Sequence, residues 1–260
     1  MTERAVQSAS VEQSRSLDAA SAQLGISVDA LMAIAGFQCA RLAQILLEEM
    51  KSAGPVAVLA GRGNNGGDAL GCARHLAVWG FKVRALTLAD RDASESVTSR
   101  QGRAAQASGV EFRHVGEGDE ETIAWTLAGS ALVVDGLLGT GSSGPLRGVV
   151  LDTVRQLNHA GARVLAIDVP SGLEATGGGA DGDTVRADDT LMLAIPKSGC
   201  LIPDAGALVG RLWLADIGIP AQAYWDSGVE PPTFSAGGLQ RYPAPGEGPL
   251  NQTPPNSGRR

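Results

Sequence analysis

Three loops carry most of the residues whose chemistry suggests a ligand site, and each loop directly follows an apolar run. The first, residues 61–68, contains four glycines among its first seven residues and ends in Asp68. The second spans residues 135–145 and the third residues 168–172, and each opens on an aspartate. A glycine loop that leads from a strand into a helix exposes backbone N–H groups that can bind phosphate or a similar anion.

The two aspartates at the ends of apolar runs, Asp135 and Asp168, point to function because burying a carboxylate must be compensated. One interpretation is that each accepts hydrogen bonds from backbone N–H groups of its own loop. The other is that these carboxylates join Asn65 and Ser171 as oxygen ligands of a hard cation. With so few negative charges, such a site suits potassium better than calcium.

The pattern Gly61-x-Gly63-x-x-Gly66 also matches a dinucleotide-binding fingerprint, although this short match alone is a weak signal. Asp68 fits that interpretation poorly, because a carboxylate near the start of the helix would repel a pyrophosphate. The alternative for Asp68 is helix capping, which the helix dipole favours. An ordinary nicotinamide oxidoreductase is disfavoured, since no acid/base pair for hydride transfer is evident.

The elements that must position these loops alternate between strands and helices. Short apolar runs at 56–60, 131–134 and 163–167 read as buried strands, and amphipathic or alanine-rich segments follow them. This alternation predicts a three-layer α/β/α Rossmann-like fold with a mainly parallel central sheet. Because ligands bind outside the carboxyl ends of parallel strands, the three loops should meet at one edge of the sheet.

The ends of the chain differ in character from this central part. Residues 1–15 are polar and predict a flexible N-terminus, followed by a short helix from Ser16 that stops at Gly25. A long helix should run from the N-cap Ser27, and its Gly36 would allow another backbone to approach closely. We expect one domain over residues 16–220. The proline- and glycine-rich residues 221–260 predict a disordered tail.

Composition excludes several classes of protein. The 260-residue chain carries a net charge of −7, which gives no reason to expect nucleic-acid binding. We expect no membrane span, because no apolar run approaches the ~20 residues that a span requires. The cysteines are far apart, without zinc-ligand spacing, and the N-terminus lacks the features of a secretory or transit signal. We therefore expect a cytoplasmic protein without a membrane partner.

Several ordered motifs resemble the YjeF N-terminal family, the NAD(P)H-hydrate epimerases, over roughly residues 16–220. The landmarks are residues 31–36, 61–68, 135–148, 167–173, 184–190, 197–199 and 215–220. The chain departs from the family pattern at Ile34, where a polar residue is common, and at Ala69, where glycine is common. Neither departure touches the residues to which the resemblance assigns chemistry, although both could affect the rate.

The resemblance implies an isomerase that interconverts the R and S forms of hydrated NADH and NADPH (NADHX and NADPHX), as part of nicotinamide nucleotide repair. An ADP- or ATP-dependent dehydratase specific for the S form would be its functional partner. By resemblance, the substrate is bound by Asn64, Asn65, Gly66, Gly67, Asp68, Gly139, Thr140, Gly141, Ser142, Ser143, Gly144, Pro145 and Asp168. The resemblance also assigns potassium to Asn65, Asp135 and Ser171.

Asp168 is the candidate catalytic residue. The hydrated carbon is a hemiaminal beside the ring nitrogen, so Asp168 as general acid would protonate the leaving hydroxyl, and water would return to the other face with a carboxylate as base. The alternative is a non-catalytic scaffold of the same fold that binds a nucleotide, a protein or RNA. The N-terminal helices could form an isologous interface, which predicts a homodimer.

Overall fold

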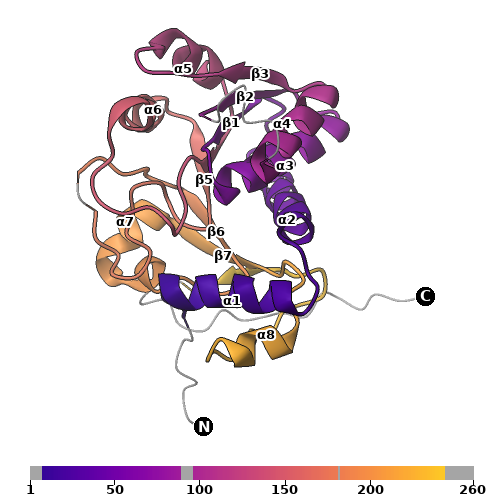
Figure 1. Cartoon of the computed structure of the whole chain (residues 1–260). Coiled ribbons are helices and arrows are strands. Elements are labelled where there is room, and N and C mark those ends of the chain that lie inside the picture. Colours follow the sequence, from indigo (N-terminus) through magenta and orange to yellow (C-terminus); the bar gives the residue numbers. More distant parts are fainter. Residues whose placement is uncertain (1–7, 89–95, 181, 244–260) are drawn as a thin grey trace.

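The computed structural model describes residues 8–88, 96–180 and 182–243 (Figure 1). Within these residues the helices are α1 (Val11–Gln23), α2 (Val28–Glu49), α3 (Asn64–Val78), α4 (Val97–Ala107), α5 (Glu120–Leu127), α6 (Gly148–His159), α7 (Gly206–Val209) and α8 (Ala221–Asp226), with 3₁₀ turns η1 (Ser198–Leu201) and η2 (Pro203–Ala205). The strands are β1 (Val56–Ala60), β2 (Val83–Thr87), β3 (Glu111–His114), β4 (Leu132–Gly136), β5 (Arg163–Ile167), β6 (Asp189–Leu193), β7 (Arg211–Ala215) and β8 (Leu239–Tyr242).

All of these strands belong to one sheet with the order β3-β2-β1-β4-β5-β6-β7-β8, in which only β8 pairs antiparallel. Helices α2, α3 and α4 lie on one side of the sheet, and α5 and α6 lie on the other (Figure 1). The prediction of a three-layer α/β/α fold with a mainly parallel sheet is therefore confirmed. The order reverses between β1 and β4, and ligands of such folds bind at the carboxyl edge of the sheet beside this reversal.

The strands form where they do because both faces of the sheet are covered. Along β1, Val56 and Val58 belong to the core beneath α2 and α3, while Ala57 and Leu59 belong to the core beneath α5 and α6. All five residues of β1 are buried, so the run is continuously apolar rather than alternating. The rigid layer that results holds the loop at 61–63 in place.

Helix α2 packs against α3 through glycine. A Cβ added at Gly36 would lie 2.9 Å from the Cα of Gly71, so the two backbones are in contact, as the glycine at position 36 predicts.

By its length and composition, helix α2 could cross a membrane, contrary to the expectation that no segment is long enough. However, 61% of its apolar window is buried inside the fold, as in the core helix of a globular domain.

Two predictions about the chain ends are wrong within the described residues. Helix α1 begins at Val11 rather than Ser16, because Ser10 and Gln13 form a capping box at its start. The segment after residue 220 forms α8 and then β8, which extends the sheet beside β7. Residues 1–7 and 244–260, to which the remaining expectations of disorder apply, lie outside the described residues.

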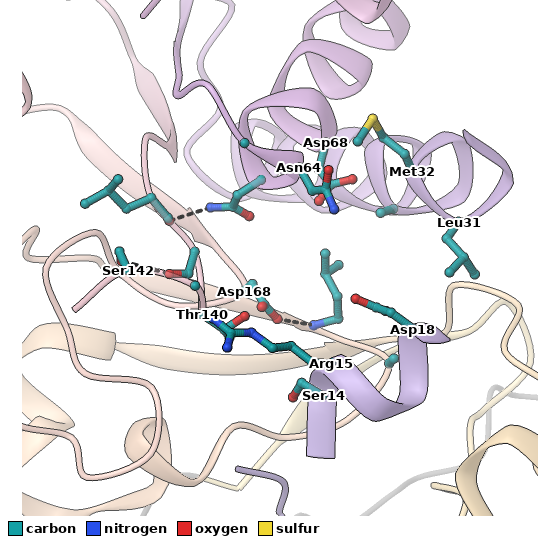
Figure 2. Close-up of a pocket in the computed structure, with 18 of the residues that line it drawn as sticks. Ser14, Arg15, Asp18, Leu31, Met32, Asn64, Asp68, Thr140, Ser142 and Asp168 are labelled. Atoms are coloured by element: carbon teal, nitrogen blue, oxygen red, sulfur yellow. Dashed lines mark hydrogen bonds between the residues drawn. The ribbon is translucent and has the colours of Figure 1, made fainter. Parts of the chain in front are cut away.

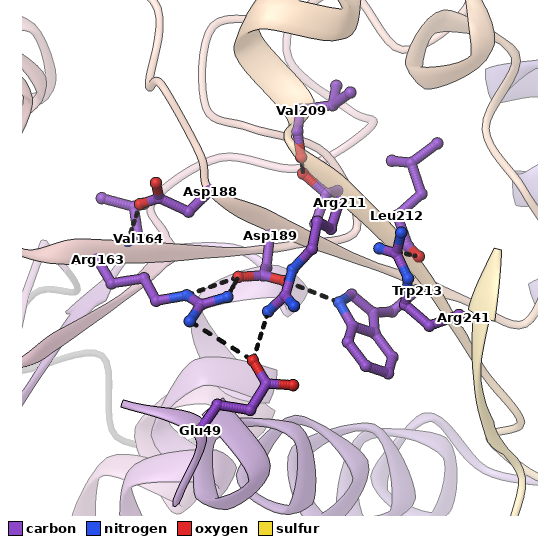
Figure 3. A network of polar contacts seen from close by, with 11 residues as sticks. Glu49, Arg163, Val164, Asp188, Asp189, Val209, Arg211, Leu212, Trp213 and Arg241 are labelled. Carbon is purple, nitrogen blue, oxygen red and sulfur yellow. Dashed lines mark hydrogen bonds and ion pairs between the residues drawn. The ribbon is translucent and has the colours of Figure 1, made fainter. Parts of the chain in front are cut away.

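A polar network at the amino ends of the strands joins α2 to the sheet (Figure 3). The fully buried Asp189 accepts hydrogen bonds from the Arg163, Arg211 and Trp213 side chains at 2.8–2.9 Å. Glu49, the last residue of α2, pairs with Arg211 at 2.8 Å. Removing one member of such a buried network leaves an uncompensated charge, so we attribute a structural role to it, at the opposite edge from the crevice.

Candidate functional site

A cavity of about 570 Å³ occupies the crevice at the carboxyl edge of the sheet (Figure 2). Its walls come from the loops after β1, β4, β5 and β6, together with one side each of α1 and α2. The approach of two of these loops requires glycine: a Cβ at Gly61 would lie 1.8 Å from the carbonyl oxygen of Leu137. The predicted meeting of the loops at 61–68, 135–145 and 168–172 is confirmed.

Asp168 lies on one wall of the cavity, directly after β5, with a left-handed backbone (φ 67°). Its carboxylate pairs with the ammonium of Lys197 at 2.5 Å and accepts a bond from the backbone N–H of Leu193 at 3.2 Å. Lys197 is itself buried and donates to the carbonyls of Leu193 and Ile195. A carboxylate and an ammonium group are thereby fixed side by side at the cavity wall.

Asp68 lies on the facing wall, in the second turn of α3 (Figure 2). The residue is only 8% exposed, and its side chain makes no hydrogen bond or ion pair with any residue that the structure describes. Burial raises the pKa of Asp68 well above its usual value, and the negative charges of Asp168 and Asp18 raise it further. Asp68 is thus a carboxyl group that favours its protonated form, turned toward the cavity.

The capping alternative for Asp68 is wrong. The N-cap of α3 is Gly63, and Asp68 lies inside the helix without a capping bond. Asp135 caps its own loop through the backbone N–H of Leu137 at 3.2 Å, as the capping interpretation predicts, and it also accepts from the backbone N–H of Ser171, in the loop after β5, at 2.9 Å. Burial raises the pKa of Asp135, and these hydrogen bonds oppose the shift.

The three predicted potassium ligands lie close together, with Asn65 on the cavity wall and the buried Asp135 and Ser171 behind it. The Ser171 hydroxyl donates to Asp135 at 2.7 Å, and the Asn65 amide donates to the Leu138 carbonyl at 2.6 Å. Ser171 Oγ also lies 3.4 Å from that carbonyl oxygen. The Asp135 carboxylate, the Ser171 hydroxyl and the Leu138 carbonyl therefore lie together, with the Asn65 amide beside them, and such oxygen donors fit a cation of low charge density.

The other predicted substrate-binding residues divide into three groups. Asn64, Asn65, Gly139, Thr140, Gly141 and Ser142 line the cavity, as do Asp68 and Asp168. Ser143 and Gly144 line a smaller neighbouring cavity of about 230 Å³. Gly66, Gly67 and Pro145 line neither, and Gly66 instead packs against the backbone of Gly61. Substrate contact by these last residues stays a prediction.

Three charged residues outside the three candidate loops also line the cavity: Lys197, Arg15 and Asp18. Lys197 could have been noticed, because it directly follows the apolar run 191–196, as Asp135 and Asp168 follow theirs. Asp18 lies at the cavity mouth, and desolvation inside the cleft raises its pKa although its outer side stays exposed. Arg15 and Asp18 lie on α1, which carries no recognisable motif.

The fold and site define a doubly wound α/β domain with a ligand crevice at the point where its strand order reverses. The sequence profile described as "YjeF-related protein N-terminus" matches residues 28–199. The chain belongs to this family. The crystal structure of yeast ynu0, YNL200c, has the same fold, with a TM-score of 0.76 and 22% identity over 91% of this chain and all of that one.

Curated relatives cover most of the chain. An NAD(P)H-hydrate epimerase of Dehalogenimonas lykanthroporepellens is 39% identical over 225 residues, covering 85% of this chain and 86% of the relative. Its counterpart in Rhodopirellula baltica is 38% identical over 177 residues, covering 68% and 71%. The bifunctional NAD(P)H-hydrate repair enzyme Nnr of Thermofilum pendens is 36% identical over 84% of this chain, which matches 41% of that enzyme.

Proposed function

We propose that the protein is an NAD(P)H-hydrate epimerase, an isomerase of nicotinamide nucleotide repair. The observation that carries the proposal is the pair of differently situated carboxyl groups on facing walls of one cavity, Asp68 and Asp168. Relatives at 38–39% identity that bear this name support the reaction class. No observation favours the alternative of a non-catalytic scaffold.

The two facing groups suit a reaction that must proceed on both faces of a ring. The protonated Asp68 can donate its proton to the leaving hydroxyl, which departs as water while the ring nitrogen lone pair forms an iminium-like intermediate. A second water then adds to the opposite face and gives a proton to the Asp168 carboxylate. The groups finish with exchanged protonation states, which is the arrangement that runs the reverse reaction.

Lys197 holds the Asp168 carboxylate in place for this role through the 2.5 Å ion pair. This assignment differs from the simpler expectation that Asp168 alone is the general acid, because Asp168 is already paired with a cation whereas Asp68 is not. Both versions require Asp168 at the reacting carbon.

The direct test is an epimerisation assay on mixed R and S forms of NADHX and NADPHX. A dehydratase strictly specific for the S form reports how fast the R form is converted. We expect the purified protein to accelerate the equilibration of both hydrates. Failure to accelerate either hydrate would contradict the proposal.

We further propose that potassium binds at Asn65, Asp135 and Ser171 and steadies the loops that carry Asp168 and the 139–142 segment. Replacing sodium chloride by potassium chloride at equal ionic strength should raise the Tm by about 3–10 °C, the effect of a ligand at 10–100 times its Kd on a domain of this size. Calorimetry of the wild type and of Ser171→Ala tests this, since the variant should lose the potassium-specific rise. Ser108→Ala, which loses a hydroxyl bonded to Ala104 on α4, should keep it.

A functional partner follows from the reaction. An epimerase repairs the cofactor only together with an enzyme that dehydrates the S form, and we propose an ADP- or ATP-dependent dehydratase in that role. Bifunctional relatives named for NAD(P)H-hydrate repair support this pairing.

We also propose a cytoplasmic location. All three cysteines are buried and free, which supports a reducing compartment.

We also propose a homodimer formed through α2 and α3. Ile34 and Phe37 on α2, and Val78 and Trp79 at the end of α3, are exposed, and the Phe37 and Trp79 rings pack edge to face with centroids 5.8 Å apart. Apolar groups gathered in this way commonly mark an interface. Light scattering should give twice the chain mass for the wild type, and Trp79→Glu should shift it toward one chain. A measured mass of one chain for the wild type would contradict the proposal.

A further inference from the structure

Helix α1 completes the cavity and brings a charged side chain to it. Leu17 buries itself against the core, and Ala9, just before the helix, forms a parallel bridge with Lys197. The Ala9 N–H donates to the Pro196 carbonyl at 2.8 Å, and the Ser198 N–H donates to the Ala9 carbonyl at 3.2 Å. The start of α1 is therefore fastened to the same loop that holds the Asp168–Lys197 pair.

Arg15 extends from α1 into the cavity toward Thr140 and Asp168 (Figure 2). Its guanidinium lies beside the 139–142 loop, since a Cβ on Gly141 would be 3.9 Å from Arg15 Nη2. Arg15 makes no hydrogen bond or ion pair with any residue in the described part of the chain. Its donors are directed at a glycine-containing loop and at open space.

The other cations of the cavity have partners. Lys197 pairs with Asp168, and Arg62 donates through Nε to the Leu88 carbonyl at 2.8 Å. Among the described residues, Arg15 is thus the cavity cation whose guanidinium has no protein partner, whereas Arg62 is held through Nε and Lys197 through its ion pair. A guanidinium presents a planar fork that matches phosphate oxygens, and a neighbouring glycine loop lets a phosphate approach the backbone.

We infer that Arg15 binds the diphosphate of the nicotinamide dinucleotide, an assignment that rests on the proposed function. The reacting ring must lie between Asp68 and Asp168, and the diphosphate is separated from that ring by a single ribose. The 2′-phosphate of NADPHX is carried by the second, adenosine ribose and lies much farther along the molecule. Arg15, which reaches toward Asp168, is placed for the nearer group.

Kinetics on four proteins test the inference: wild type, Arg15→Gln, Arg15→Lys and, as a matched loss of an exposed arginine outside the cavity, Arg186→Gln. Arg15→Gln should raise the KM for NADHX and for NADPHX by the same factor, about 10–100-fold, with a much smaller change in kcat. Arg15→Lys should retain part of the affinity, because it keeps the charge but loses the fork. Arg186→Gln should behave as wild type.

A second readout separates this inference from the proposed function. ADP-ribose carries the diphosphate without the nicotinamide ring, and calorimetry should show its binding weakened by the same factor in Arg15→Gln. If wild type fails to epimerise but binds ADP-ribose in an Arg15-dependent way, the proposed reaction is wrong and the inference stands. Unchanged KM and unchanged ADP-ribose binding would overturn it, as would a loss confined to NADPHX, which would assign Arg15 to the 2′-phosphate.

Discussion

Replacing Asp168 by asparagine should lower the kcat of epimerisation by about 10²–10⁴-fold, the usual contribution of a positioned acid or base. The amide keeps the shape of the side chain but cannot accept a proton from the attacking water. Asparagine also tolerates a left-handed backbone better than most residues, so the turn at φ 67° should persist. The measurement is the rate of conversion of R to S hydrate, with the fold checked by circular dichroism.

Asp183→Asn provides the matched control for this experiment. Asp183 is a carboxylate paired with Arg155 at 2.9 Å on the surface, and it does not line the cavity. Its variant should keep the wild-type rate. A folded Asp168→Asn protein with nearly full activity would show that Asp168 does not act at the reacting carbon.

Asp68→Asn should also lower kcat, by about 10²-fold or more, because the amide has no acidic proton to give to the leaving hydroxyl. If the protonated form of Asp68 is the acid, the wild-type kcat should fall as pH rises through the raised pKa of this group. A pH profile of kcat for wild type and variant measures both effects. A variant that changes only KM would limit Asp68 to substrate binding.

Asp68→Asn should lower activity but raise the stability of the folded protein at neutral pH. Because the pKa of Asp68 is higher in the folded than in the unfolded chain, folding holds a proton that the unfolded chain releases, and the wild type loses stability as pH rises from the unfolded pKa through the folded one. Asparagine carries no charge at any of these pH values. The Tm of Asp68→Asn relative to wild type should therefore rise from acid to neutral pH, whereas Asp183→Asn should show no such gain.

The sequence predicted the part of the site that lies at strand ends. Asp135, Asp168 and the 61–68 loop each follow an apolar run, and parallel strands bring their carboxyl ends to one edge, so proximity follows from topology. The sequence could not distinguish the environments of these carboxylates. Asp135 accepts hydrogen bonds from Leu137 in its own loop and from Ser171 in the loop after β5, while Asp68 has no partner among the described residues. This difference depends on side-chain contacts made only in the folded chain.

The missed features have a common physical cause. Helix α1 is polar, with exposed residues on most of its surface, so its few buried contacts through Leu17 and Ala20 leave only a weak periodic signal. Strand β8 was not predicted because it lies in a proline- and glycine-rich segment, and it forms through its pairing with β7. Both elements depend on contacts with residues far away in the sequence, and local composition does not predict such contacts.

Because α1 packs beside the cavity, residues that we propose to bind the ligand and residues that we propose to react lie in different parts of the chain. The family match covers residues 28–199, which include Asp68, Asp168 and Lys197, but it begins after α1. A wall of the cavity therefore lies outside the shared segment. A comparison restricted to the matched residues would therefore include the proposed reacting groups but leave out Arg15, to which we assign part of the affinity for the ligand.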